Sequence, residues 1–228
     1  MRVALCDDEP KDLVCLETLC KKYDPNGQLE CESFLSASQL LNAAETTSFD
    51  LILLDIEMEG VTGFEAAEQL IKQKRPPLIV FVTKSQAYCV RGYGVAFRYL
   101  VKPIQWQEFE NALDAALMEY QSNRLMFNLN EQRQTVYIGD IMYLETYDHV
   151  TIVHTTQQQY PVRMSLTELA GHLPRSCFAF SQKSYLVNMH YIQTTTNAQI
   201  TLTDGSKIPI SRRKRTDFNA QLNDFLGR

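Results

Sequence analysis

The sequence lacks the features that mark a membrane protein or a secreted protein held together by disulfides. No apolar run approaches the roughly 20 residues of a transmembrane helix, and the opening stretch MRVALCDDEP turns acidic too early for a secretory signal. Six cysteines are present, but they are scattered, with no CxxC pair and no zinc-ligand spacing. We therefore expect a cytoplasmic protein with no membrane insertion, whose thiols stay reduced.

Positive charge is scarce in the first half, although the whole chain has a net charge of only −5. Residues 1–122 contain 11 Lys and Arg against 19 Asp and Glu, whereas residues 123–228 contain 11 against 8. All four histidines lie in the second part. An acidic half joined to a mildly basic half predicts two domains with different partners.

Residues 1–121 alternate between short apolar runs and stretches with helical periodicity. The central run, LILL at 51–54, has the composition of a strand buried on both faces. The other candidate strands are residues 3–6, a segment ending at Phe34, residues 78–82 and residues 98–101. Candidate helices begin at Pro10, at Ser36 or Ser38 and at Thr62, and span 86–95 and 105–121. Five strand-helix units predict an α/β fold with a doubly wound, five-stranded parallel sheet.

Chemically active side chains stand where four of these strands end. Asp7 and Asp8 follow the first strand, Asp55 the third, Thr83 the fourth and Lys102 the fifth. The carboxyl ends of parallel strands share one edge of the sheet, so these groups can converge. Clustered carboxylates need a cation, and oxygen ligands favour Mg²⁺. A lysine and a hydroxyl beside them suit a phosphoryl group, which Asp55 could accept as an acyl phosphate.

This set of residues, together with DIEMEGVTG at 55–63, resembles the signature of response-regulator receiver domains. The resemblance covers about residues 1–120, and we assign the receiver domain to residues 1–121. It implies that a sensor histidine kinase phosphorylates Asp55. It also implies a Mg²⁺ cofactor, held by Asp7, Asp8, Asp55 and the backbone carbonyl of Glu57.

The same resemblance assigns roles to three further residues. Thr83 and Lys102 would bind phosphoryl oxygens, and Tyr99 resembles the aromatic switch that turns inward when the threonine moves. One departure is Glu59, which stands where many relatives have proline. We expect this difference to alter the stiffness of the loop more than its chemistry.

The pattern changes after a short polar break at 122–125, which we predict to be a linker. Residues 126–228 contain many short runs of alternating apolar and β-branched residues, separated by turns such as Asp204-Gly205. One short helix is expected at 165–173, and Ser211 is expected to cap a final helix. The second domain should therefore be mostly β.

Within this domain, SYLVN at 184–188, Tyr191-Ile192 and IPIS followed by basic residues at 208–215 resemble the LytTR DNA-binding domain. The resemblance covers about residues 124–226 and suggests a two-component response regulator of the LytTR (LytR/AgrA-like) family. That family reads DNA with loops between strands. The resemblance implies DNA contacts at His149, Lys183 and Arg212, and backbone contacts at Arg163 and Arg213.

Two observations bear on how DNA would be bound. The basic run at 212–215 lies at a predicted helix N-terminus, a place that favours phosphate. Phe180 and Gln182, however, stand where many relatives have arginine and histidine. We therefore expect a different sequence preference and weaker affinity from that loop.

The leading hypothesis is a phosphorylation-dependent transcription regulator, not an enzyme, that binds double-stranded promoter DNA as a homodimer. The dimer would form through 86–95, 98–101 and 105–121. One alternative is a Mg²⁺-dependent aspartyl-phosphate phosphatase. Enzymes of the haloacid-dehalogenase type carry an acid two residues after the nucleophile, usually as DxD on the first strand. Here that acid would be Glu57, on the third strand, and the first-strand pair Asp7-Asp8 is adjacent in sequence. Another alternative is a receiver whose second domain binds protein or RNA.

Overall fold

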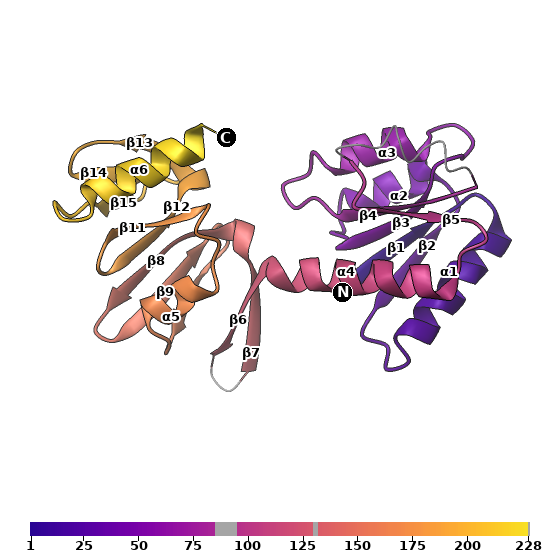
Figure 1. Ribbon diagram of the computed structural model, residues 1–228, viewed down its shortest axis with the longest axis horizontal. Helices are drawn as coiled ribbons and strands as arrows, with labels where there is room; N and C mark the ends of the chain where they lie inside the picture. Colours follow the sequence, from indigo (N-terminus) through magenta and orange to yellow (C-terminus); the bar gives the residue numbers. More distant parts are fainter. Residues whose placement is uncertain (85–94, 130–131, 228) are drawn as a thin grey trace. The chain divides into compact units, whose positions relative to one another are not determined.

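The computed structural model describes residues 1–84, 95–129 and 132–227 (Figure 1). The chain divides into two compact units, Met1–Gln121 and Ser122–Arg228. The helix predicted at 86–95 falls almost entirely outside the described residues. None of the helices in the described ranges combines the length and apolar character needed to cross a bilayer.

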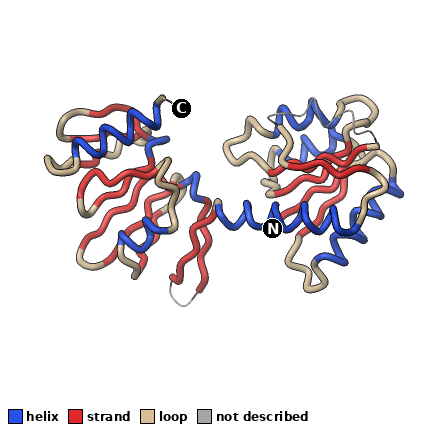
Figure 2. The backbone as a smooth tube through the Cα atoms, in the orientation of Figure 1, coloured by secondary structure: helices blue, strands red, loops and turns tan. Residues whose placement is uncertain are grey.

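The first unit is built on five parallel strands in the order β2-β1-β3-β4-β5, which confirms the predicted doubly wound sheet. Its strands are β1 Arg2–Cys6, β2 Glu30–Phe34, β3 Leu51–Asp55, β4 Leu78–Thr83 and β5 Arg98–Val101. Its described helices are α1 Pro10–Tyr23, α2 Ala37–Ala44, α3 Gly63–Leu70 and α4 Trp106–Ser122. Helices α2 and α3 lie on one face of the sheet, and α1 and α4 lie on the other (Figure 2).

Strand β3 is buried on both faces because helices cover both. Successive side chains of a strand point to opposite faces. Ile52 and Leu54 pack in the core beneath α2 and α3, whereas Leu51 and Leu53 pack in the core beneath α1 and α4. All four side chains are fully buried, as the composition of this run predicts.

Side chains at the helix starts fix the loops that lead into them. Ser36 caps α2 by accepting a hydrogen bond from the Gln39 backbone N–H. Of the two serines expected as the cap, Ser36 is therefore the one used. Thr62 caps α3 in a capping box with Glu65. The loop between β3 and α3 is therefore held at its far end by a local interaction.

The junction between the units is shorter than the predicted linker at 122–125. Helix α4 continues through Ser122 and strand β6 begins at Arg124, so Asn123 alone separates them.

Antiparallel strands dominate the second unit, which confirms a mostly β domain. They form a sheet of order β10-β9-β8-β12-β11, a sheet of order β13-β14-β15 and a β6-β7 hairpin. The strands are β6 Arg124–Leu129, β7 Gln132–Tyr137, β8 Ile141–Tyr147, β9 Val150–Thr155, β10 Gln159–Val162, β11 Phe178–Gln182, β12 Tyr185–Asn188, β13 Ile192–Thr195, β14 Gln199–Leu202 and β15 Lys207–Pro209. The helices are α5 Leu166–Gly171 and α6 Arg215–Leu226, with 3₁₀ turns at Ile138–Asp140 and Met189–Tyr191. Strand β11 was not predicted.

The larger sheet of this unit has a core on each face. On β12, Leu186 packs with α5 and the β6-β7 hairpin, whereas its neighbour Val187 packs with the smaller sheet and α6. The prediction that Ser211 caps the last helix is wrong. Helix α6 begins at Arg215, and the Ser211 hydroxyl instead accepts a hydrogen bond from the Lys214 backbone N–H in the preceding turn.

Phe218 anchors α6 in this second core, with none of its surface exposed. We expect Phe218→Ala to lower the free energy of unfolding by about 3–5 kcal/mol, because it leaves a cavity in a packed core. Urea denaturation followed by circular dichroism measures this. Asn219, the next residue, is exposed, so Asn219→Ala should change stability by less than about 0.5 kcal/mol. Equal stability of the two variants would contradict this account of α6.

Candidate functional site

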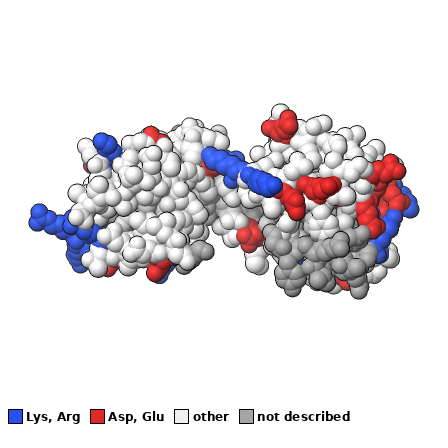
Figure 3. Space-filling view, turned by 90° about the horizontal axis from the view of Figure 1, so that it is seen from above, with Lys and Arg blue, Asp and Glu red and all other residues white. Residues whose placement is uncertain are grey.

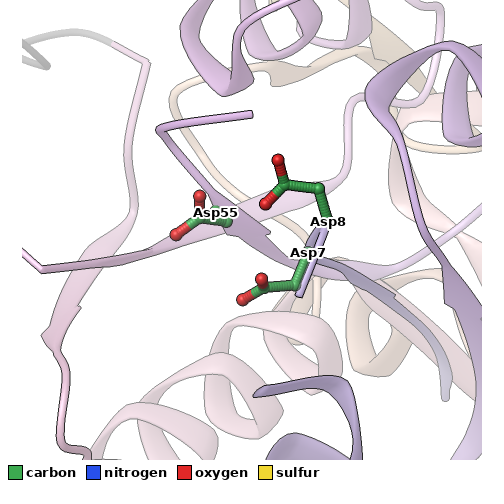
Figure 4. A group of neighbouring side chains, drawn as sticks. All are labelled: Asp7, Asp8 and Asp55. Atoms are coloured by element: carbon green, nitrogen blue, oxygen red, sulfur yellow. The ribbon is translucent and has the colours of Figure 1, made fainter. Parts of the chain in front are cut away.

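Three aspartates meet at the carboxyl edge of the parallel sheet (Figure 4). Asp7 and Asp8 follow β1, and Asp55 is the last residue of β3. One carboxylate oxygen from each lies within 4.8 Å of the others. They meet because β1 and β3 are neighbours, with Cys6 paired opposite Leu54. Asp7 and Asp55 are buried, whereas Asp8 is partly exposed.

Lys102 supplies the positive charge at this cluster. Its Nζ lies 2.7 Å from Asp7 Oδ2 and 3.0 Å from Asp55 Oδ1. It also lies 2.7 Å from Asp12 Oδ2, in the first turn of α1. Asp12 was missed by the sequence reasoning, which considered only strand ends. Its position five residues after Asp7, in a helix that starts beside the cluster, was the available signal.

Burial and charge shift the pKa values of the two central groups. Burial raises the pKa of Asp55 to about 6, and the charge of Asp7 adds to this, while Lys102 and a hydrogen bond from the Glu57 backbone act in the opposite direction. Burial alone would lower the pKa of Lys102, but its bonds to Asp12, Asp7 and Asp55 outweigh burial and raise that pKa above its usual range. At pH 7, Lys102 is therefore a cation, and most Asp55 carboxylates are ionised.

The other residues singled out in this unit lie around the cluster. Thr83 ends β4 and is fully buried, and its strand pairs with both β3 and β5. Tyr99 lies half-buried on β5, with its ring centroid 5.5 Å from that of Phe81. Glu57 has an exposed side chain, while its backbone bonds to the Asp55 carboxylate.

The loop after β3 is held closely against the acidic cluster. The Glu59 backbone N–H donates to Asp8 Oδ2 at 3.3 Å, a bond that proline could not make. Gly60 adopts a φ of +79°, which glycine tolerates best. A Cβ on Gly63 would lie 2.0 Å from the Asp55 carbonyl oxygen, so only glycine fits there without a shift of backbone.

The basic residues predicted to contact DNA are all exposed in the second unit. His149 lies in the β8–β9 turn with a φ of +65°, and Arg163 follows β10. Lys183 lies in the β11–β12 turn, and Arg212 and Arg213 precede α6. In the view of Figure 3, acidic side chains gather on the first unit, with some basic ones beside them, and basic side chains extend from the second.

A groove of about 560 Å³ brings Lys183 and Arg213 together. His149, Arg163 and Arg212 do not line it. Beside this groove, the Ser211 backbone N–H donates to the Ser181 carbonyl at 3.0 Å, which ties the segment before α6 to β11. The remaining lining residues are Thr167, Phe180, Gln182, Ser184, Ser211 and Lys214. Cations and hydroxyls in one groove are suited to phosphate oxygens.

Ser184 and Ser211 were missed as possible contacts because β11 was not predicted from the sequence, whereas Lys214 belongs to the basic run at 212–215 noted there. Without that strand, nothing placed the β11–β12 turn beside the start of α6. Gln182, one of the two departures noted from the sequence, donates from its side-chain amide to the Ser184 hydroxyl at 3.2 Å.

The two units match two known domain families. The profile of the response regulator receiver domain matches residues 3–114, and that of the LytTr DNA-binding domain matches residues 132–223. The fold of the first unit is that of a receiver domain. The chain belongs to the two-component response regulators that join a receiver to a LytTr DNA-binding domain.

Curated relatives match this chain along nearly their whole length. The chain is 29% identical over 243 residues to the sensory transduction protein LytT of Bacillus subtilis (strain 168), covering 98% of this chain and 99% of LytT. It is 27% identical over 246 residues to the transcriptional regulatory protein YpdB of Escherichia coli (strain K12), covering 98% and 100%. It is 24% identical over 245 residues to the transcriptional regulatory protein LytR of Staphylococcus aureus (strain bovine RF122 / ET3-1), covering 97% and 99%.

Solved structures resemble each unit separately. The response regulatory domain of protein mrkE from Klebsiella pneumoniae is 25% identical, with a TM-score of 0.48, and covers 53% of this chain and 98% of that one. The LytTr DNA-binding domain of a putative methyl-accepting/DNA response regulator from Bacillus cereus is 23% identical, with a TM-score of 0.40, and covers 44% and 96%.

Because Gly63 lies so close to Asp55, we predict that any side chain at position 63 lowers the stability of the protein. We expect Gly63→Ala to lower the free energy of unfolding by about 1–3 kcal/mol, because the new Cβ forces the loop and α3 away from β3. Urea denaturation provides the measurement. Gly171 has open space around its Cα, so Gly171→Ala is the matched control and should change stability little. An unchanged Gly63→Ala variant would mean that the loop does not approach this closely.

Proposed function

We propose that this protein is a phosphorylation-dependent transcription regulator. A sensor histidine kinase transfers a phosphoryl group to Asp55, and the second unit then binds promoter DNA in the cytoplasm. The observation that carries the proposal is the grouping of Asp55 with Asp7, Asp8 and Lys102, at the end of the central strand. A mostly ionised carboxylate beside a fixed cation is suited to attack phosphorus.

The transfer exchanges one bond to phosphorus for another. A carboxylate oxygen of Asp55 forms the new P–O bond while the P–N bond of a phosphohistidine breaks, and the imidazole leaves with the electron pair. Lys102 lies 3.0 Å from Asp55 and would bind an oxygen of the arriving group. The buried Thr83 hydroxyl would bind another, and Tyr99 would move into the space that Thr83 leaves.

The acidic cluster fits a magnesium ion. Its donors are all oxygens, and three carboxylates within 4.8 Å of one another repel unless a cation joins them. Asp7, Asp8, Asp55 and the backbone carbonyl of Glu57 would hold the ion. When bound, Mg²⁺ would supply positive charge that neutralises phosphoryl oxygens.

The second unit would bind DNA through its exposed basic loops. His149, Lys183 and Arg212 are proposed to contact bases or the DNA backbone, and Arg163 and Arg213 to contact the backbone. The groove between Lys183 and Arg213 supports this, because it gathers cations from two separate segments. Phosphorylation would favour a homodimer of receivers, and two linked DNA-binding domains would gain effective concentration on repeated half-sites.

Asp55→Asn removes the ionised oxygen and should abolish phosphorylation. We expect the parent, but not this variant, to gain the mass of one phosphoryl group from a phosphorylated histidine kinase or from acetyl phosphate. Intact-protein mass spectrometry reads this directly. Glu68 is an exposed acid of the same unit, so Glu68→Gln also removes one negative charge. The Glu68→Gln variant should be phosphorylated like the parent. Phosphorylation of the Asp55→Asn protein would show that another residue is the acceptor.

Removing cations from the groove should weaken duplex binding in a salt-dependent way. We expect the double variant Lys183→Ala, Arg213→Ala to show a shallower slope in a plot of log affinity against log salt concentration. The slope should become less negative by about 0.9 for each DNA phosphate that the protein no longer neutralises. Titration of a random-sequence duplex pool at several NaCl concentrations measures this. Lys207→Ala is the control, because Lys207 is an exposed cation of the same unit outside the groove. An identical salt slope in parent and double variant would remove the groove from the DNA-binding surface.

A further inference from the structure

Lys102 contacts three carboxylates, and the proposed phosphoryl chemistry uses only two of them. An ammonium group has three N–H donors. Three carboxylate oxygens lie at hydrogen-bonding distance from it, those of Asp7 at 2.7 Å, Asp12 at 2.7 Å and Asp55 at 3.0 Å. Asp7 and Asp55 belong to the proposed site for metal and phosphoryl group. Asp12 has no role in that site, yet it lies as close to Lys102 as Asp7 does.

Helix α1 holds Asp12 in this position. Leu13 and Leu16 anchor the helix in the core beneath the sheet, which fixes the rotation of its first turn. At the other end of α1, the Tyr23 hydroxyl donates to Asp114 Oδ1 of α4 at 2.6 Å. The ion pair itself is largely shielded, with 12% of the Lys102 side chain and 21% of the Asp12 side chain exposed.

This ion pair matters once a phosphoryl group arrives. The group adds up to two negative charges and three strong acceptor oxygens beside Lys102. The Asp12 carboxylate, 2.7 Å from the ammonium, offsets part of the positive charge that would attract a phosphoryl oxygen, and it also repels the arriving group. Asp12 therefore competes with the phosphoryl group for the same cation.

We infer that Asp12 is a positioning residue that holds Lys102 in the unphosphorylated protein and opposes the phosphoryl state of Asp55. The inference rests on the proposed function of Asp55 and adds a regulatory element to that site. The strength of the Asp12–Lys102 pair then sets how readily the receiver adopts its phosphorylated form.

A merely structural role for Asp12 would have a different signature. An acid in the first turn of a helix also stabilises the helix through its dipole. That role alone would change the stability of the protein without changing its affinity for a phosphoryl mimic. Anion affinity and thermal stability, measured side by side, therefore separate the two roles.

The test is the binding of beryllofluoride with Mg²⁺ to the whole chain by isothermal titration calorimetry. We expect Asp12→Asn to bind about threefold to tenfold more tightly than the parent, because one repelling charge at close range is gone. Asp12→Ala should behave likewise, whereas Asp12→Glu restores the charge and should return towards the parent affinity. Glu17→Gln is the matched control, since Glu17 lies on the same helix but bonds the Ser33 hydroxyl instead.

Three results would overturn the inference. If the parent binds beryllofluoride and Asp12→Asn binds equally well or more weakly, the inference fails and the proposed function stands. If Glu17→Gln strengthens binding as much as Asp12→Asn, the effect is one of general charge, and the Asp12–Lys102 ion pair has no particular role. If the parent does not bind beryllofluoride at all, the proposed phosphoryl site fails together with the inference.

Discussion

The structure of the first unit depends on charge compensation at one edge of its sheet. Three carboxylates are brought within 4.8 Å of one another, two of them buried, and they repel unless positive charge is supplied. Lys102, which directly follows β5, supplies it, so β1, β3 and β5 must keep their positions in the sheet for the charges to balance. Helix α1, through Asp12, adds a fourth element to the same balance.

Such a balance is sensitive to one added charge, and that sensitivity is what a phosphorylation switch requires. A phosphoryl group on Asp55 would change the partners of Lys102. This change would affect each element that contributes a carboxylate. The loop after β3 cannot easily move independently of the aspartate cluster, because the Glu59 backbone bonds Asp8 and Gly63 lies against the Asp55 carbonyl. The second unit lacks such a cluster among its described residues, and presents cations at its turns instead.

The strands that carry the first site could be predicted because each combines an apolar run with a polar end. LILL ending in Asp55 is of this kind, and Thr62 was recognisable as a helix cap. Other features could not be predicted. Ser211 has the residue type of a cap, but the chain makes one further turn before α6 begins. Strand β11, FAFSQ, is short and ends in polar residues, and it exists because β12 pairs with it.

The sequence by itself determined the alternation of strands and helices, the chemical groups at the strand ends and the division of charge between two domains. These follow from local periodicity and residue type, which act over a few neighbouring positions. Only the tertiary structure decided that Asp12 reaches Lys102, that Gly63 meets the Asp55 carbonyl, and that Lys183 shares a groove with Arg213. Each of these interactions joins separate elements, and their distances depend on how helices and strands pack against one another.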